Sequence, residues 1–157
     1  MTTDTQSDSQ PDPQPQVPGW IRRHLEEYAR DPENARLFDA TQVGGPKDTP
    51  TLLLTTHGRR TGRILTMPLI YGEAGGAYVV IASKGGAPAH PGWFHNLSAE
   101  PNVDIQVGAE KLAVTARVAE GEERARLWGQ MAEIYPPYLE YQEKTDRVIP
   151  VVVLEPR

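Results

Sequence analysis

Three short apolar runs follow one another between residues 51 and 96, and they constrain the fold more than any other part of the chain. The runs cover residues 51–56, 65–71 and 77–82, and the connections between them contain glycine. Short runs joined in this way are typical of antiparallel strands that neighbour each other in a sheet. Pro68 cannot donate a backbone hydrogen bond, so we expect the second strand to lie at an edge or to carry a bulge. The stretch therefore predicts an antiparallel meander.

The rest of the chain supplies further strands and several helices. Further strands are expected at residues 103–108 and 111–119, joined by a hairpin at 108–110, and at 147–154. Helices are expected at residues 20–29, 91–99, 122–135 and 138–144, and a loop at 34–50 in which Leu37 and Phe38 form an anchor or a short helical turn. About six strands and three or four helices, without alternation of the two, favour an α+β fold. Short antiparallel strands favour a barrel, which closes its own edges.

Composition limits the domain organisation and the class of function. The chain has 157 residues, no cysteine and a net charge of −5. Residues 1–18 are almost without apolar side chains, so we expect a disordered tail before a single domain at residues 19–157. Without cysteine there are no disulfides or thiolate metal sites, and no secretion signal or membrane span is evident, which predicts a cytoplasmic protein. The acidic balance argues against nucleic-acid binding.

Two loops, one after the first apolar run and one after the third, carry cationic side chains and no acid. The first holds Arg59, Arg60 and Arg63 between glycines, and the second begins Ser83-Lys84 and continues with a glycine pair. Guanidinium groups and exposed turn amides bind phosphate or carboxylate groups, and paired glycines let a flat ligand approach the backbone. The alternative is a solvated hairpin tip in the first case and an ordinary turn in the second. The pattern is compatible with a small anionic ligand.

Aromatic side chains are candidates for a second part of the site. Tyr135, Tyr138 and Tyr141 recur at every third position, a spacing that either packs as core or lines a pocket for a flat substrate. Trp20 begins an amphipathic helix, which either packs on the domain, covers a site as a lid or touches a membrane surface. The four histidines lack a metal-binding pattern, so no metal site is expected.

The chain resembles the deazaflavin-dependent nitroreductase family over about residues 50–156. The resemblance is carried by GRRTGR at 58–63, TMPLIY at 66–71, YVVIASKGGAPAHPGWFHNLSAEPNV at 78–103 and YPPYLEYQEKTDRVIPVVVLEP at 135–156. It implies a split β-barrel like that of flavin-binding pyridoxamine oxidases. It also implies the cofactor F420, whose reduced form donates hydride to quinones, nitroaromatics or other electron-poor acceptors.

The resemblance also implies roles for individual residues. Tyr138 and Ser83 would be catalytic, with Ser83 helping protonation, and Tyr135, Tyr138, Tyr141 and Trp20 would bind the substrate. The cofactor would be bound by Arg59, Arg60, Thr61, Gly62, Arg63, Met67, Pro68, Ile81, Ala82, Ser83, Lys84, Gly85, Gly86, Trp93, Phe94 and Asn96. Leu65 stands where family members often carry a basic residue, and Ile70 where they often carry an aromatic one.

Several alternatives stay open at this point. An FMN-dependent reductase and a non-catalytic F420 carrier would both use the same fold and the same anion-binding loops. Peripheral membrane contact through the N-terminal helix and self-association into a homodimer are compatible with the sequence. Hydride transfer from a cofactor needs no protein nucleophile, which agrees with the lack of a triad-like pattern.

Overall fold

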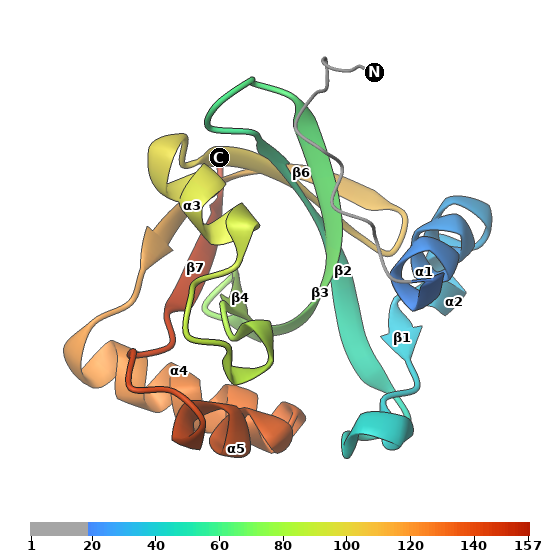
Figure 1. Cartoon of the computed structure of the whole chain (residues 1–157). Coiled ribbons are helices and arrows are strands. Elements are labelled where there is room, and N and C mark those ends of the chain that lie inside the picture. Colours follow the sequence, from blue (N-terminus) through green and yellow to red (C-terminus); the bar gives the residue numbers. More distant parts are fainter. Residues whose placement is uncertain (1–18) are drawn as a thin grey trace, which may run out of the picture.

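The structure of the protein, a computed structural model, describes residues 19–157. The predicted disordered tail at residues 1–18 lies outside the described residues. The described residues form seven strands and five α-helices around an antiparallel barrel, which Figure 1 shows end-on. This arrangement confirms the expected α+β class and the barrel.

Six strands build the barrel. In spatial order they are β2 (Thr49–His57), β3 (Ile64–Ala74), β4 (Ala77–Ile81), β7 (Val151–Pro156), β6 (Glu110–Val118) and β5 (Asn102–Val107). Every neighbouring pair is antiparallel, and β2 pairs with β5 through residues 53–55, which closes the sheet on itself. Closure leaves each of these strands with a neighbour on both sides over at least part of its length.

Alternation along the strands explains the barrel core. In β2, Leu52, Leu54 and Thr56 are buried, whereas Leu53 and Thr55 between them are only half-buried. The inward side chains meet Val80 and residues of the other strands in a first apolar cluster inside the barrel. A second cluster lies between the sheet and the helices α4 (Gly121–Ile134) and α5 (Pro137–Glu143), below the barrel in Figure 1.

The remaining helices cover the barrel at other places. They are α1 (Gly19–Arg30), α2 (Pro32–Ala35) and α3 (Gly92–Ala99), together with the 3₁₀ turns η1 (Thr41–Val43) and η2 (Lys84–Gly86). Ile21, His24 and Tyr28 form the buried stripe of α1, as its amphipathic pattern predicts. The Tyr28 hydroxyl donates to the Thr51 carbonyl at 2.9 Å and accepts from the Gly108 amide at 3.0 Å. These bonds fasten α1 to the barrel.

The strand β3 is split between two partners, and this split positions the functional site. Its residues 64–70 pair with β2, and its residues 71–74 pair with β4. The first half of β3 therefore has a neighbour on one side only among the described residues. Pro68 lies in this half, opposite Leu53. Because no strand within residues 19–157 pairs with this half on its open side, the missing amide hydrogen of Pro68 breaks no hydrogen bond there. The predicted edge position of Pro68 is confirmed.

Two expectations about local structure were wrong. Leu37 and Phe38 form a short strand, β1 (Leu37–Phe38), that pairs with residues 49 and 50, rather than a helical turn. The last strand begins at Val151, because the chain at 147–150 makes other contacts. The break between α4 and α5 is as expected, with Tyr135 as the C-cap of α4 and Tyr138 in α5. Within residues 19–157 no helix is long and apolar enough to cross a membrane.

Candidate functional site

A cavity of about 770 Å³ lies at the open half of β3. Its wall combines α1, the segment after β1, the first half of β3, the connection after β4, the start of α3 and the three tyrosines near α5. The lining residues are Trp20, Ile21, His24, Phe38, Asp39, Ala40, Gln42, Val43, Thr51, Leu65, Thr66, Met67, Pro68, Leu69, Ile70, Ile81, Ser83, Lys84, Gly85, Pro91, Gly92, Trp93, Tyr135, Tyr138 and Tyr141. Segments far apart in the sequence thus meet around one space, which we call the large cavity.

The segment 82–87, which we call the nest loop, brings three backbone amides together on the cavity wall. Ser83 has right-handed backbone angles (φ −83°, ψ −40°), and Lys84 follows with φ at 48° in the left-handed region. A right-handed residue followed by a left-handed one forms a nest, in which successive N–H groups point into one anion-binding concavity. Within the described residues, the amides of Ser83, Lys84 and Gly85 have no acceptor. They are available to a ligand.

The backbone of the nest loop is strained at one position. Lys84 is the one non-glycine residue with positive φ among residues 19–157, and such a residue costs about 1–3 kcal/mol. Gly85 and Gly86 continue in the left-handed region at 63° and 82°. A Cβ at Gly86 would lie 2.6 Å from the Tyr141 carbonyl oxygen, so the nest loop packs directly on the backbone of α5. Strain that persists in this way is typical of functional sites.

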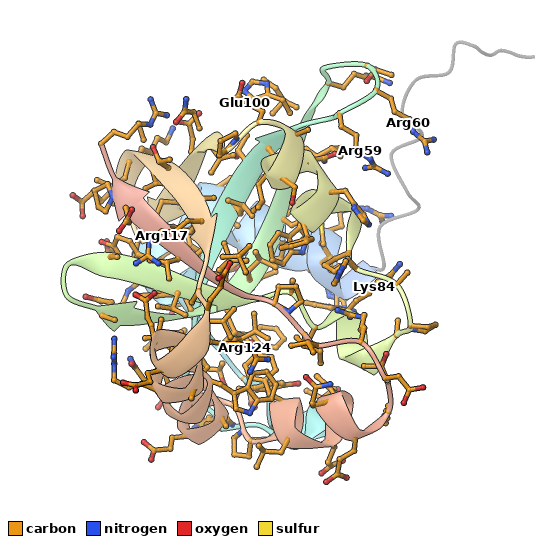
Figure 2. The ribbon with its side chains drawn as sticks, turned by 90° about the vertical axis from the view of Figure 1, so that its left-hand side faces the viewer. Arg59, Arg60, Lys84, Glu100, Arg117 and Arg124 are labelled. Carbon is orange, nitrogen blue, oxygen red and sulfur yellow. The ribbon has the colours of Figure 1, made fainter. Side chains whose placement is uncertain are left out.

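The arginine loop between β2 and β3 lies near the cavity but does not line it. Arg59 donates from its amide and from Nη1 to Oδ1 of Asn96, at 3.1 and 3.2 Å, and Asn96 in turn donates to Thr56. Asn96 is buried and so ties the loop to α3. Figure 2 shows Arg59, Arg60 and Lys84 on the same side of the molecule, with Arg117 toward the opposite side. The two predicted cationic loops therefore share one face.

Three tyrosines form another part of the cavity wall, which we call the tyrosine wall. The hydroxyls of Tyr135 and Tyr141 lie 2.9 Å apart, and the rings of Tyr135 and Tyr138 meet edge to face with centroids 4.8 Å apart. Burial raises the pKa of Tyr138, and burial and the hydrogen bond to Tyr141 raise that of Tyr135. Both phenols therefore stay protonated at neutral pH. The Tyr138 hydroxyl has no hydrogen-bond partner within the described residues, although the side chain is only 4% exposed.

A second aromatic wall comes from α1 and β1. The Trp20 ring lies 5.8 Å from Phe38, and His24 meets Phe38 edge to face at 5.2 Å. His24 Nε2 lies 3.0 Å from the Thr51 hydroxyl, whose own proton is directed to the carbonyls of Ala35 and Arg36. His24 is thus one of three partners of the buried Thr51 hydroxyl. Burial lowers the pKa of this histidine, although nearby Glu27 opposes the shift.

The structure brings many, but not all, of the predicted site residues to this cavity. Those that line it are Trp20, Met67, Pro68, Ile81, Ser83, Lys84, Gly85, Trp93, Tyr135, Tyr138 and Tyr141. Those that do not line it are Arg59, Arg60, Thr61, Gly62, Arg63, Ala82, Gly86, Phe94 and Asn96. Gly86 instead packs on Tyr141, which lines the cavity, and Asn96 holds the arginine loop through Arg59.

Sequence reasoning missed the contribution of the part of the chain before β3, and in particular of the segment 38–45, which we call the N-terminal arm. His24, Thr51 and the segment 38–43 line the large cavity, but none of them was predicted. The glycine pair at 44–45 was the available signal, because a Cβ at Gly45 would lie 2.7 Å from the Tyr135 ring. The glycine allows this arm to close against the tyrosines.

The chemical character of the cavity follows from these walls. It offers free amides and a lysine at one place, phenol donors at another, and apolar or aromatic side chains between them. Among residues 19–157 no group of His, Cys, Asp or Glu side chains could hold a metal ion. Such a space suits a flat, partly anionic molecule together with a flat acceptor that receives hydrogen bonds.

Comparison with known proteins gives consistent matches. A family model described as F420H(2)-dependent quinone reductase matches residues 26–156. A Mycobacterium tuberculosis protein named F420H(2)-dependent quinone reductase is 40% identical over 149 residues, which cover 88% of this chain and 97% of that protein. A solved F420-H2-dependent reductase, FDR-A, is 48% identical with a TM-score of 0.63 over 68% of this chain and 94% of its own. A structure described as a domain-swapped dimer is 42% identical with a TM-score of 0.64, over 87% of this chain and 97% of its own.

Proposed function

The chain belongs to the F420H(2)-dependent quinone reductase family, and we propose that it reduces quinones with F420 bound in the large cavity. The observation that carries this proposal is that the nest at residues 83–85 and the tyrosine wall line the same space. One supplies donors for an anionic cofactor, and the other supplies donors for an acceptor.

The residues present fit F420 on structural grounds. A deazaflavin with a phosphate and a carboxylate tail needs a slot for a flat ring and donors for negative charge. The free amides of the nest loop and the exposed Lys84 supply the donors, and Met67, Pro68 and Trp93 supply apolar surface. Arg59 and Arg60, on the same side of the molecule as Lys84 in Figure 2, would meet the anionic tail. When bound and reduced, the cofactor supplies hydride.

We assign the acceptor to the tyrosine side of the cavity. A quinone that takes up hydride becomes a hydroquinone anion, and one proton then completes the hydroquinone. The Tyr138 hydroxyl, protonated and without a partner among residues 19–157, would donate a hydrogen bond to the oxygen on which charge grows. Ser83, half-buried in the nest loop, is our candidate for passing the proton from solvent. Trp20 and Phe38 would exclude water from the opposite side.

The direct test is turnover with the purified chain. We expect reduced F420 to be oxidised on addition of menadione, which is measured as the return of the deazaflavin absorbance. We also expect F420 to bind to the chain in a fluorescence titration. A chain that binds F420 but oxidises it no faster than buffer, with menadione and with a nitroaromatic, would contradict the reductase proposal and favour a carrier. A chain that ignores F420 altogether would contradict the cofactor assignment as well.

Self-association and membrane contact are separate questions. The relative described as a domain-swapped dimer supports a proposal that this chain also forms a homodimer. Light scattering at several concentrations tests it, and a mass that stays at 17.4 kDa would contradict it. Trp20 packs on Phe38 and lines the cavity, and its predicted contact with a membrane surface stays a prediction.

A further inference from the structure

One arginine side chain holds the nest loop from behind. Arg147 donates from Nε to the Ala87 carbonyl at 2.8 Å, from Nη2 to the Ser83 carbonyl at 2.7 Å and from Nη1 to the Ala82 carbonyl at 3.2 Å. Nη1 also lies 2.9 Å from Nδ1 of His90. One guanidinium group thus contacts both ends of the loop and the histidine that follows it. Arg147 does not line the large cavity.

The backbone around Arg147 is fixed to the tyrosine wall. Gln142 of α5 donates from Nε2 to the Arg147 carbonyl at 2.8 Å and accepts from the Ile149 amide at 3.0 Å. The Arg147 amide donates to the Thr145 hydroxyl at 3.2 Å. The backbone of Arg147 is therefore anchored to α5, the helix that carries Tyr138 and Tyr141, and its side chain reaches across to the nest loop. This bridge explains why the chain at 147–150 does not continue β7.

Peptide geometry links these carbonyl contacts to the free amides. In a trans peptide the C=O and N–H of one unit point in opposite directions. The carbonyls of Ala82 and Ser83 point to Arg147, so the amides of Ser83 and Lys84 in the same two peptide units point away from it. These amides belong to the nest and have no acceptor within the described residues. The guanidinium group therefore binds these two peptide units on the side opposite to the nest amides.

Charge adds to this orientation. Arg147 makes no ion pair with a carboxylate in the described part of the chain, so its positive charge is not neutralised behind the nest loop. The strained φ of Lys84 lies between two of the carbonyls that Arg147 binds, those of Ser83 and Ala87. A strained turn persists only where its surroundings hold it, and Arg147 supplies such contacts on both sides.

We propose that Arg147 is a positioning residue for the anionic cofactor: its planar fork of donors holds residues 82–87 so that the nest amides face the large cavity. The inference rests on the proposed function for the identity of the ligand, but not for the order of the loop. Its positioning effect requires the fork, because a lysine ammonium on a flexible stem cannot reach three carbonyls in one plane. His90 is part of the arrangement, since it can accept from Nη1 only while Nδ1 is unprotonated.

The test compares Arg147→Lys and Arg147→Met with a matched control, Arg124→Met. Arg124 also donates to a backbone carbonyl, that of Ile149 at 2.8 Å, but it packs over Trp128 and does not line the cavity. Hydrogen–deuterium exchange of the protein without cofactor reports the order of residues 83–87 directly. Fluorescence titration with F420 reports affinity, and steady-state kinetics report the KM for reduced F420 and for menadione.

We expect both Arg147 variants to exchange faster at residues 83–87 and to bind F420 about tenfold more weakly or worse, with the KM for menadione little changed. Arg124→Met should leave these values near those of the unaltered chain. Unchanged exchange and affinity in Arg147→Met would overturn the proposal, and so would full rescue by lysine, which would leave a role for charge alone. If the unaltered chain fails to bind F420 but the exchange result holds, the positioning role stands and the proposed function falls.

A measurement on the unaltered protein covers the case in which the Arg147 variants do not fold. The Nε–H of Arg147, bound to the Ala87 carbonyl, should give a resolved NMR signal that exchanges slowly with solvent. Exchange as fast as that of an exposed arginine such as Arg60 would overturn the proposal.

Discussion

Replacing Gly86 by alanine should separate the two walls of the large cavity. A Cβ at this position would lie 2.6 Å from the Tyr141 carbonyl oxygen and 3.0 Å from its Cα. Ordinary contact begins near 3.4 Å, so the nest loop and α5 must move apart by roughly 0.8 Å (3.4 − 2.6). Both partners are backbone, which cannot turn aside as a flexible side chain can. The substitution therefore tests whether this close approach fixes the site.

The magnitude can be divided into two contributions. Alanine at a φ of 82° brings its Cβ too close to the following carbonyl oxygen, a strain that glycine avoids and that costs about 1–2 kcal/mol. Overpacking against α5 adds about 1–3 kcal/mol. Gly76→Ala is the matched control, because its φ is 86° and a Cβ there would meet nothing within 4 Å. Only the first contribution applies to the control.

The assay is urea unfolding of the two variants beside the unaltered chain. We expect Gly86→Ala to lose about 2 kcal/mol more free energy of unfolding than Gly76→Ala, or about 4–8 °C in Tm at this chain length. The KM for menadione should also rise in Gly86→Ala, because Tyr138 and Tyr141 move with α5. Equal losses in the two variants would refute the argument that close packing on Tyr141 requires the glycine.

Three further predictions concern single groups at the site. Tyr138→Phe should lower kcat with menadione about tenfold and leave F420 affinity unchanged. Its free energy of unfolding should be equal or higher by about 1 kcal/mol, because the buried hydroxyl that it removes has no partner within residues 19–157. A loss of stability in urea would contradict this. Lys84→Gly and Lys84→Ala should both weaken F420 binding several-fold in a fluorescence titration. The glycine variant should be the more stable of the two in urea by about 1 kcal/mol, since only glycine adopts the left-handed φ without strain. Equal stabilities would argue against strain at this position. Burial lowers the pKa of both His24 and His90, and Arg147 and His95 contribute at His90, so the stability that these histidines provide is complete above their ordinary pKa of 6.5 and is lost as the pH falls toward their folded values. Urea midpoints at pH 7.5 and pH 5 measure this loss. In the His24→Gln, His90→Gln double variant, the midpoint should fall between these pH values only by the amount that other groups contribute.

Local patterns were enough to predict most strands and helices. Alternation in β2 and the turns around glycine predicted the meander, and Pro68 predicted the open edge of β3. The two-residue strand β1 could not be predicted, because its pairing with residues 49 and 50, not its own sequence, makes it a strand. Closure of β2 on β5 joins residues about fifty positions apart and has no local signal.

The site was predicted less completely, for two physical reasons. Tyr135, Tyr138 and Tyr141 were candidates for either core or pocket, and their place beside the cavity depends on contacts with distant segments, which no local pattern shows. Arg147 escaped notice because its partners are backbone carbonyls about sixty residues earlier, and carbonyls are present at every residue. Side-chain identity alone could not indicate which of them it would bind.

The nest also affects how the site tolerates mutation. Main-chain amides belong to every residue except proline, so substitution of the Ser83 side chain leaves the donors in place. The shape that gathers these donors depends instead on Gly86 and a distant Arg147, neither of which lines the cavity. Sequence drift in this protein should therefore be freest at some positions that face the ligand and most restricted at positions that never touch it. A survey of natural variants that looks for constraint only among lining residues would miss the two residues that hold the nest loop in place from outside the cavity.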